Sequence, residues 1–350
     1  MFKLRLNLAC HRYDRTAALI DGRVQPEGID LNYMQVEPWE TFWRMLHHSE
    51  FDVAELSTSG YLITLERTPP PYIALPVFPS KMFRHGAIYI NPQSGIQEPK
   101  DLEGRRVGGP EFSQTAALWV RGILQDEYGV DLTRVHWFRG GLEAPDPVER
   151  VELNLPPKMR LEEIPAGKTL SGMLEAGELD AVIGPQPPSS FVRRSPKVAR
   201  LFPNYRDVEM SYYQKTGLFP IMHSIVIKRS IYEANPWVAA SLMKAFEAAK
   251  AHCYQQIAQT GVLQASLPWL HWHLEEEFRF FGRDPFAYGV EANRGELETL
   301  ARYSHEQGLT HRLANVDTLF AKEATDMFIA EARYGARPPV GPFQFVEGAR

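Results

Sequence analysis

Short strand patterns and short helix patterns alternate along this chain from its first residues. Apolar side chains recur at every second position in residues 4–8 and again in residues 29–33, which is the period of a half-buried strand. They recur at helical spacing in residues 39–46, and residues 51–56 then predict another strand. Because elements in this order pack helices against a sheet, the pattern predicts an α/β fold.

A second α/β unit is predicted from about residue 101. Residues 105–109 predict a strand that leaves through two glycines, and residues 116–127 predict a helix that ends at Gly129. Residues 170–184 repeat the order of helix, glycine and strand, so a second parallel α/β layer is expected. Residues 141–168 are rich in Pro and Glu without a clear period, and we expect an insertion or arm there.

The last third of the chain carries one strand pattern and then helix patterns. The strand is predicted at residues 222–227. The strongest helix signal starts at Asn235-Pro236, where proline takes the first helical position. Further helices are predicted at about 268–281, 295–307 and 316–330, and residues 337–350 are expected to form an extended tail.

Composition excludes several classes of protein. The chain has 350 residues, 38 Lys and Arg against 43 Asp and Glu, and 44% hydrophobic residues, which is typical of a folded globular protein. No Lys/Arg-rich block offers a surface for nucleic acid or anionic lipid. No apolar run approaches the ~18 residues of a membrane helix. The first residues alternate like a strand and not like a signal peptide, so a cytoplasmic location is expected.

The cysteines and the standard motifs give no sign of a metal or nucleotide site. Cys10 and Cys253 stand in no CxxC or Cys/His spacing, so we expect two packed thiols and neither a disulfide nor a zinc site. GxGxxG, GxxxxGK[ST], HExxH and GxSxG are all absent from the sequence. His271 and His273 diverge on a helix, which favours a solvated helix surface over a metal cluster.

Several phrases of the sequence resemble those of known proteins. Residues 52–57 (Asp-Val-Ala-Glu-Leu-Ser), 101–108 (Asp-Leu-Glu-Gly-Arg-Arg-Val-Gly) and 177–182 (Gly-Glu-Leu-Asp-Ala-Val) resemble the type II periplasmic-binding-protein fold of nitrate, taurine and sulfonate binders. Within that fold, residues 9–15 (Ala-Cys-His-Arg-Tyr-Asp-Arg), the Arg84-His85 pair and residues 218–223 (Leu-Phe-Pro-Ile-Met-His) are similar to the 4,5-dihydroxyphthalate decarboxylase family. The resemblance covers about residues 1–330.

The resemblance implies two lobes that close on a ligand. Residues 1–91 and 217–336 would form the first lobe, with the C-terminal helices, and residues 92–216 the second. Helix starts at residues 57–59 and around residues 109–115 would face the cleft, where free N–H groups attract anions.

The resemblance also implies a cofactor-independent decarboxylase of a hydroxylated aromatic dicarboxylate. Such a site must supply an acid near the ring carbon, a base near the phenol, and cations for the spectator carboxylate. We expect His223 or His11 to be the acid, and Arg12 and Arg84 to clamp the carboxylate. The candidate catalytic residues are His11, His85 and His223, and the candidate substrate-binding residues are Arg12, Arg15, Arg84, Ser57, Thr58, Ser59, Ser113 and Gln114.

Two other functions stay open at this point. One is a non-catalytic binding protein that captures a small anionic ligand for a transporter. The other is a metal-assisted lyase that uses His11, Asp14, His85 or His223, although no spacing supports it and no cofactor is chemically necessary. A homo-oligomer also stays open, as does the identity of the aromatic acid and of the carboxylate that it loses.

Overall fold

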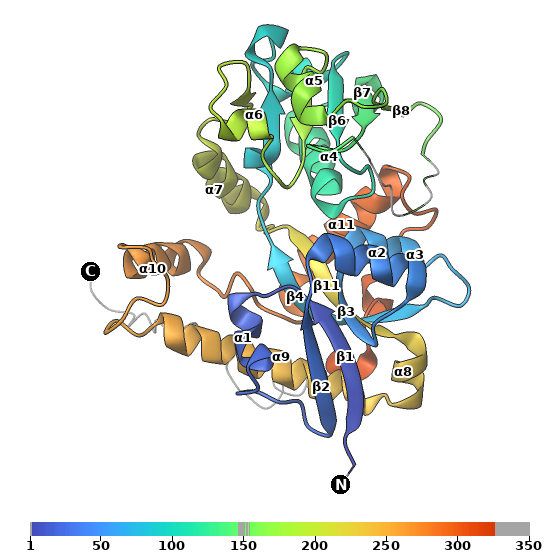
Figure 1. The fold of residues 1–350 in the computed structure, drawn as a ribbon, viewed down its shortest axis with the longest axis vertical. Coiled ribbons are helices and arrows are strands. Elements are labelled where there is room, and N and C mark those ends of the chain that lie inside the picture. The colour runs from blue at the N-terminus through green and yellow to red at the C-terminus, as the bar shows by residue number, and fades with distance from the viewer. Residues whose placement is uncertain (1, 146–150, 152, 154, 326–350) are drawn as a thin grey trace.

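The structure is a computed structural model that describes residues 2–145, 151, 153 and 155–325. It consists of two lobes, each built on one sheet (Figure 1). The predicted α/β class is therefore confirmed. Among the described residues, no helix has both the length and the apolar character to cross a membrane.

The first sheet combines strands from both ends of the chain. Its order is β2 (Ile29–Gln35), β1 (Leu4–Cys10), β3 (Val53–Ser57), β11 (Ile221–Lys228) and β4 (Tyr72–Lys81). Strand β1 runs parallel to β2 and β3, whereas β11 is antiparallel to both of its neighbours. The helices that follow the strands of this sheet are α1 (Ala17–Ile20), α2 (Pro38–His48), α3 (Thr58–Thr64), α8 (Arg229–Ala234) and α9 (Trp237–Ile257).

The second sheet has the order β10 (Ala199–Arg200), β5 (Ile88–Ile90), β9 (Ala181–Ile183), β6 (Arg106–Gly109), β7 (His136–Arg139) and β8 (Arg160–Glu163). Strands β9, β6, β7 and β8 are parallel, as expected, and β5 is antiparallel to β9 and β10. The helices of this lobe are α4 (Thr115–Tyr128), α5 (Leu170–Ala176), α6 (Ser189–Val192) and α7 (Tyr205–Thr216).

The chain crosses between the sheets twice. Strand β5 pairs with β9 in the second sheet, so the first crossing lies between Lys81 and Ile88 and not at residue 91 as predicted. The apolar run of β5 gave no indication of which sheet it would join. The second crossing follows α7, which ends at Gly217 with a left-handed φ of 70°, and leads into β11.

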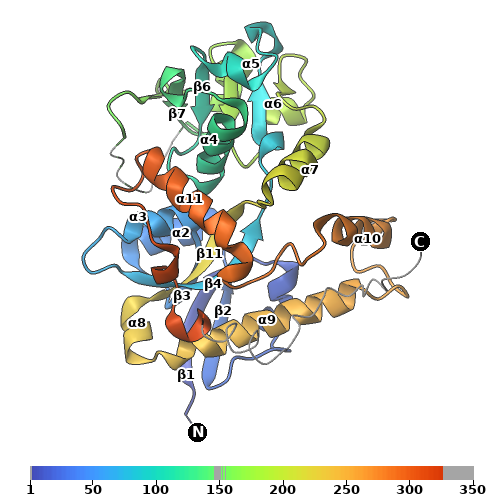
Figure 2. The ribbon, with the colours of Figure 1, turned by 180° about the vertical axis from the view of Figure 1, so that it is seen from behind.

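The C-terminal helices lie at the predicted residues but occupy different positions in the fold. Helix α10 (Leu270–Phe281) stands away from the rest of the chain beyond the end of α9 (Figure 1). Helix α11 (Arg294–Glu306) lies across the junction of the lobes (Figure 2). Of the helix predicted at residues 316–330, the described part holds the 3-10 turn Val316–Thr318 and a helical start at residues 322–325. Residues 326–336 and the tail predicted at 337–350 lie outside the described residues.

Short 3-10 turns complete the described secondary structure: Asp14–Thr16, His85–Ala87, Pro92–Ser94, Pro99–Leu102, Leu132–Arg134, Glu291–Asn293 and Val316–Thr318. Both cysteines are buried and free, so the expectation of packed thiols is confirmed.

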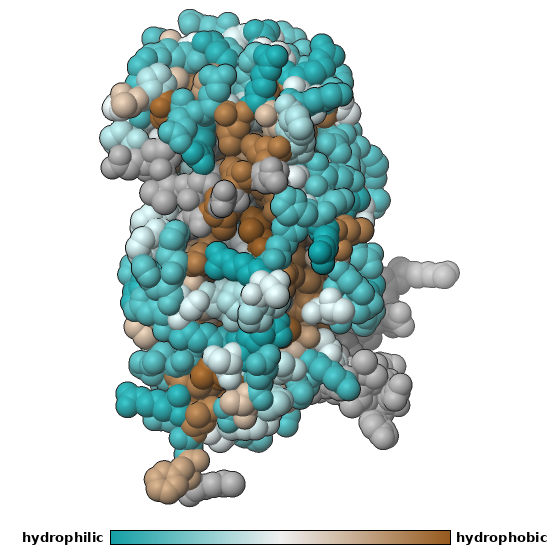
Figure 3. Space-filling model, turned by 90° about the vertical axis from the view of Figure 1, so that its right-hand side faces the viewer, coloured by the Kyte–Doolittle hydropathy of each residue, from teal (hydrophilic) through white to brown (hydrophobic). Residues whose placement is uncertain are grey.

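The region that we expected to be an insertion contributes to the core of the protein. Residues 160–163 form the edge strand β8, and Leu153, Leu155 and Met159 pack against the largest buried cluster. Figure 3 views the molecule from the right-hand side of Figure 1. It shows apolar surface at mid-height, with hydrophilic surface above and below it. Periodicity could not predict these contacts, because isolated apolar residues in a loop have no period.

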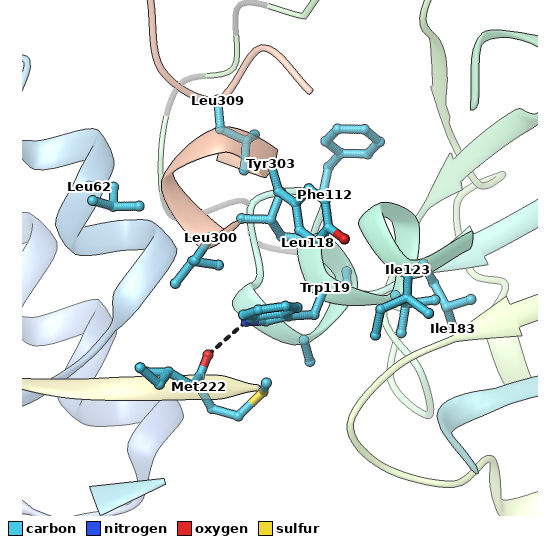
Figure 4. Close-up of a cluster of buried hydrophobic side chains, with 14 of the residues drawn as sticks. Leu62, Phe112, Leu118, Trp119, Ile123, Ile183, Met222, Leu300, Tyr303 and Leu309 are labelled. Carbon is cyan, nitrogen blue, oxygen red and sulfur yellow. Dashed lines mark hydrogen bonds between the residues drawn. The ribbon is translucent and has the colours of Figure 1, made fainter. Parts of the chain in front are cut away.

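One apolar core continues from lobe to lobe. Its centre is Trp119 of α4, whose side chain is fully buried and lies between Met222 of β11 and the side chains of α11 (Figure 4). The indole Nε1 of Trp119 donates a hydrogen bond of 2.9 Å to the backbone oxygen of Ile221. A helix of the second lobe is thereby attached to a strand of the first.

Helix α11 reinforces this attachment by packing on α4. Arg121 of α4 donates to the Gln307 side chain at 2.6 Å, and Tyr303 of α11 donates to Asp126 of α4 at 2.8 Å. The Tyr303 ring lies against Gly122 so closely that a Cβ at this glycine would be 2.2 Å from the ring. Only glycine fits at this position of α4.

A glycine replacement tests this close approach. Gly122→Ala should lower the free energy of unfolding by about 1–3 kcal/mol, because the buried Tyr303 ring must move to admit the methyl group. Gly60→Ala is the matched control, since a Cβ at this helical glycine meets its nearest neighbour at an ordinary 3.6 Å. Denaturant unfolding of both variants measures the difference. Equal stability of Gly122→Ala and the unmodified chain would contradict the described contact.

Candidate active site

The most distinctive polar cluster of the first lobe surrounds a buried carboxylate. Glu55 points from the middle of β3 and has no exposed surface. The Nδ1 atom of His223, on the neighbouring strand β11, lies 2.6 Å from Glu55 Oε1, and the Tyr13 hydroxyl donates to the same oxygen at 2.5 Å. The other oxygen accepts the backbone N–H of His11 at 2.9 Å and the Cys10 thiol at 3.4 Å. Both carboxylate oxygens are thus satisfied by groups that the strand ends bring together.

The electrostatics of the cluster favour an ionised Glu55. Burial alone raises the pKa of Glu55, but hydrogen bonds from His223, Tyr13 and the His11 backbone outweigh it, and the pKa falls below its ordinary value. Burial and the Glu55 charge raise the pKa of the Tyr13 hydroxyl, which therefore stays a hydrogen-bond donor. With Glu55 on Nδ1, the Nε2 atom of His223 has no hydrogen-bond partner among the described residues.

The predicted helix starts meet at the junction of the lobes. Ser57 caps α3, and its hydroxyl lies 2.8 Å from that of Thr115 at the start of α4. Ser59 donates to the backbone oxygen of Ser113 at 2.5 Å and lies 2.9 Å from the Thr115 hydroxyl. In the strand register, His223 is paired with Ser57. The structure therefore brings His223, Ser57, Ser59 and Ser113 into one region, where the lobes touch.

Gln114 and Thr58, the other two polar residues predicted at the helix starts, have different hydrogen-bond surroundings. Gln114, the residue before α4, has a buried Oε1 atom without a hydrogen-bond partner in the structure. A buried amide oxygen without a partner costs free energy, so it is suited to accept a hydrogen bond from a ligand. Thr58 instead pairs its hydroxyl with Ser224 at 3.0 Å inside the first lobe, which does not place it among the helix-start hydroxyls.

Arg84 lies on the first crossing and contacts the strand that carries His223. Its Nε atom donates to the sulfur of Met222 at 3.1 Å, and Met222 precedes His223 in β11. Burial lowers the pKa of Arg84 to about 10, an effect that the nearby Glu209 charge partly offsets. No ion pair within 4.0 Å joins Arg84 to a described carboxylate, although Glu209 lies near enough to affect its pKa.

His85 lies among aromatic side chains at the base of the second lobe. The chain forms the 3-10 turn His85–Ala87 ahead of β5, and both Arg84 and His85 are buried. The rings of Tyr212, Phe202 and Tyr128 lie 5.1, 5.6 and 6.4 Å from the His85 ring. Neither ring nitrogen has a hydrogen-bond partner, and burial lowers the pKa of His85 to about 4. The structure does not bring His85 to His223.

The side chains of the first loop, residues 11–15, lie in different surroundings. The His11 side chain is partly exposed, with Nδ1 3.5 Å from Glu37, and its backbone reaches Glu55. Arg15 is buried below the loop, where it donates to Asp14 and to the backbone oxygen of Pro79 and covers the Phe286 ring. Arg12 is exposed and lines a groove toward α9 and α10. These contacts give Arg15 a role in holding the loop.

The described residues contain no group of three or more His, Cys, Asp or Glu side chains that could hold a metal ion. His271 and His273 lie on α10, where His271 Nε2 is 3.1 Å from the backbone oxygen of Gln259.

Sequence reasoning missed the centre of the cluster. Glu55 entered only as part of a strand phrase, although a carboxylate on the inner face of an apolar strand is itself a signal. Tyr13 and Thr115 gave no signal of their own, because only the fold brings Tyr13 to β3 and Thr115 to α3.

Comparison with solved structures defines the class of the fold. The chain superimposes on the periplasmic aliphatic sulphonate binding protein SsuA from Escherichia coli with a TM-score of 0.51, at 13% identity over 92% of this chain and 99% of the other. No protein-family model matches the sequence. The two lobes are therefore those of a type II periplasmic-binding-protein-like fold.

Sequence comparison is more specific. A 4,5-dihydroxyphthalate decarboxylase from Comamonas testosteroni is 38% identical over 328 residues, which cover 94% of this chain and 99% of that protein. A protein of the same name from Pseudomonas putida is 43% identical over 214 residues, 61% of this chain and 83% of the other. The chain belongs to the 4,5-dihydroxyphthalate decarboxylase family.

The buried imidazole of His85 predicts a dependence of stability on pH. Its pKa is about 4 in the folded chain and ~6.5 unfolded, so the unfolded chain binds more protons between these values. The free energy of unfolding should lose about 1.4 kcal/mol per pH unit from this group as the pH falls below ~6.5, and nothing above it. His85→Phe should remove the loss, so melting temperatures at pH 7 and pH 5 should separate the variant from the parent only at pH 5.

The surface histidine His311 supplies the control for this measurement. Its side chain is 65% exposed, so His311→Gln should follow the parent chain at both pH values. A difference between His85→Phe and the parent that is the same at pH 7 and pH 5 would show that His85 does not titrate as its surroundings require.

Proposed function

We propose that this chain is a carboxy-lyase that removes CO₂ from a hydroxylated aromatic dicarboxylate of the 4,5-dihydroxyphthalate type, without a cofactor. The observation that carries the proposal is the pairing of His223 with the buried carboxylate of Glu55, beside the junction of the lobes, in a chain of this family. The names of the relatives support the substrate class and the reaction.

His223 is proposed as the acid. Because ionised Glu55 accepts the Nδ1 hydrogen, Nε2 is the ring nitrogen left to exchange a proton with a ligand. Phe42 packs edge-on against the ring at 4.8 Å and limits its rotation. Glu55 does not touch the substrate in this scheme, so it is a positioning residue.

The proposed reaction consumes one proton and needs no electron carrier. Nε2 gives its proton to the ring carbon that bears the departing carboxylate, while a hydroxyl para to that carbon loses its proton and becomes a carbonyl. The bond to the carboxylate then breaks, and its electron pair restores the aromatic ring as CO₂ leaves. The oxygen regains its proton, and the product carries hydrogen where the carboxylate stood. His11 stays the second candidate for a proton role, since its backbone is fixed on Glu55.

The spectator carboxylate is proposed to bind at the start of α4 and to Arg84. The first N–H groups of a helix of this length attract an anion, and the Gln114 side chain and the hydroxyl of Ser57 or Thr115 lie at this end. Arg84 adds a buried positive charge next to Met222. The exposed position of Arg12 makes Arg84 the stronger candidate of the two predicted arginines.

Only the similarity of fold to a binding protein favours the alternative, a non-catalytic binder of a small anionic ligand. Capture of an anion needs no proton donor, whereas the contact of His223 with Glu55 is of the kind that a proton donor requires. A cytoplasmic location, the absence of a cofactor and a homo-oligomeric state stay predictions.

The direct assay is CO₂ release from a panel of hydroxylated phthalates and benzoates, with and without a chelator. Release that disappears with the chelator would contradict the cofactor-free proposal, and no release from any acid would favour the binder.

Replacement of His223 tests the acid role. His223→Gln should lower kcat by ~10²–10⁴, the usual effect of losing a general acid, with little change in melting temperature. Glu55→Gln should reduce kcat less than His223→Gln, because the amide oxygen of glutamine can still accept the Nδ1 hydrogen of His223 and hold the ring in place. A stable His223→Gln variant with unimpaired kcat would remove His223 from the mechanism.

Replacement of the two arginines tests the clamp. Arg84→Met should weaken substrate binding by about 1.5–3 kcal/mol, the scale of a charged hydrogen bond, whereas Arg12→Met should have the smaller effect. Steady-state KM and kcat of both variants provide the comparison. If Arg84→Met keeps the parent values, the carboxylate binds elsewhere.

A further inference from the structure

Two histidines of the first lobe stand at the same edge of its sheet. Strands β2, β1 and β3 are neighbours and run in the same direction, so their carboxyl ends meet at one edge. Strand β11 runs the opposite way and pairs His223 with Ser57 at the end of β3, so its start lies at that edge too. His11 directly follows β1. Because open α/β sheets bind ligands outside the carboxyl ends of their parallel strands, both imidazoles belong to the edge where a ligand is expected.

The Tyr13 side chain contacts both of these imidazoles. Its ring meets the His11 ring edge-on, with the centroids 5.5 Å apart, and its hydroxyl oxygen lies 3.5 Å from Nδ1 of His223. Only β3 lies between β1 and β11, so the ends of these two strands are about 10 Å apart, twice the spacing of neighbouring strands. An aromatic ring with a hydrogen-bond partner at about 3 Å on each side fits such a span.

His11 has a carboxylate partner of its own. Its Nδ1 atom is 3.5 Å from Oε1 of Glu37, the residue that precedes α2. This contact favours the neutral tautomer with hydrogen on Nδ1, which leaves the lone pair on Nε2. The His11 side chain is 38% exposed, whereas the carboxylate that contacts His223 is fully buried. The first loop therefore carries a second pair of imidazole and carboxylate, and this one is open to a ligand and to solvent.

The other proton-carrying groups around Glu55 are less suited to take a proton from a ligand. Both oxygens of Glu55 already accept hydrogen bonds in the interior. The Tyr13 hydroxyl donates its hydrogen to Glu55, and burial raises its pKa. Burial also raises the pKa of the Cys10 thiol well above its ordinary value. His223 supplies a proton in the proposed scheme, so within this cluster His11 is left as the acceptor.

We propose that His11, held by Glu37, is the base that takes the proton of the substrate hydroxyl. This inference rests on the proposed decarboxylation, which needs such a base. Nε2 of His11 removes the hydroxyl proton while His223 adds a proton to the ring carbon para to it. The bond to the carboxylate then breaks, its electron pair restores the aromatic ring, and the carbonyl oxygen becomes a phenolate as CO₂ leaves. His11 returns its proton to that oxygen and solvent reprotonates His223, so each CO₂ consumes one proton.

The experiment compares two substrates that differ in the acidity of the hydroxyl. With 4,5-dihydroxyphthalate, His11→Gln should lower kcat by ~10²–10⁴, the usual effect of losing a general base. A ring-fluorinated 4,5-dihydroxyphthalate has a more acidic hydroxyl and depends less on a base, so its loss should be smaller by about tenfold or more. His223→Gln should lose activity on both substrates, because the ring carbon needs a proton in either case. Imidazole in the buffer should restore part of the activity of His11→Ala, since this side chain is partly exposed.

Replacement of Glu37 tests its role as a positioning residue. Glu37→Ala should lower kcat less than His11→Gln does, because the imidazole is kept but loses the partner of Nδ1. Glu37→Gln should restore most of the loss, since an amide oxygen can still accept the Nδ1 hydrogen. His48→Gln is the matched control: this exposed histidine ends the same helix that Glu37 precedes, and its loss should leave kcat unchanged.

The outcomes separate this inference from the proposed function. CO₂ release by the unmodified chain together with an unchanged kcat of His11→Gln would overturn the base role alone. Equal losses of His11→Gln on both substrates, without rescue of His11→Ala by imidazole, would also overturn it and give His11 a structural role. An unmodified chain that releases no CO₂ from any acid would overturn the proposed function and the base role with it.

Discussion

A carboxylate without any exposed surface is the constraint on which the first lobe depends. Ionised Glu55 would cost several kcal/mol in an apolar interior if it were left alone. The fold compensates with a hydrogen bond from each of Tyr13, the His11 backbone and His223. His11 and Tyr13 belong to the loop after β1, whereas His223 lies on β11, 210 residues beyond Tyr13. Satisfying one charge thus fixes the first loop and the returning strand in a single geometry.

The junction of the lobes depends on the same strand. The backbone of Ile221 receives the Trp119 side chain of the second lobe, and His223, two residues on, carries the imidazole to Glu55. The hydroxyls of Ser57 and Thr115 meet beside it. Helix α11 then fastens α4 from the opposite side through Tyr303 and Arg302. The imidazole of His223 and the two helix starts are therefore brought together by parts that also hold the lobes in contact.

Local patterns predicted the elements well where periodicity is strong. The strand predicted at 222–227 is β11 at 221–228, and the helices predicted at 268–281 and 295–307 are α10 at 270–281 and α11 at 294–306. The boundary between lobes was wrong because β5 is three apolar residues long and could pair with either sheet. The surroundings of Arg84 and His85 could not be predicted because the 3-10 turn at His85–Ala87 has no periodic pattern in the sequence. Glu55 was missed because its role exists only once β1, β3 and β11 are side by side.

The sequence by itself determined the α/β class, the alternation of elements, the packed cysteines, the histidine at the start of the returning strand and the family. These properties depend on periods, spacings and local residue types, which are present in the order of the residues. Tertiary structure alone decided which histidine has a buried carboxylate as its partner, which of the predicted arginines are buried, and how α11 crosses to the second lobe. Each of these depends on contacts between residues far apart in the chain. Burial and charge pairing at such contacts arise only when the sheets assemble, so no local sequence pattern predicts them.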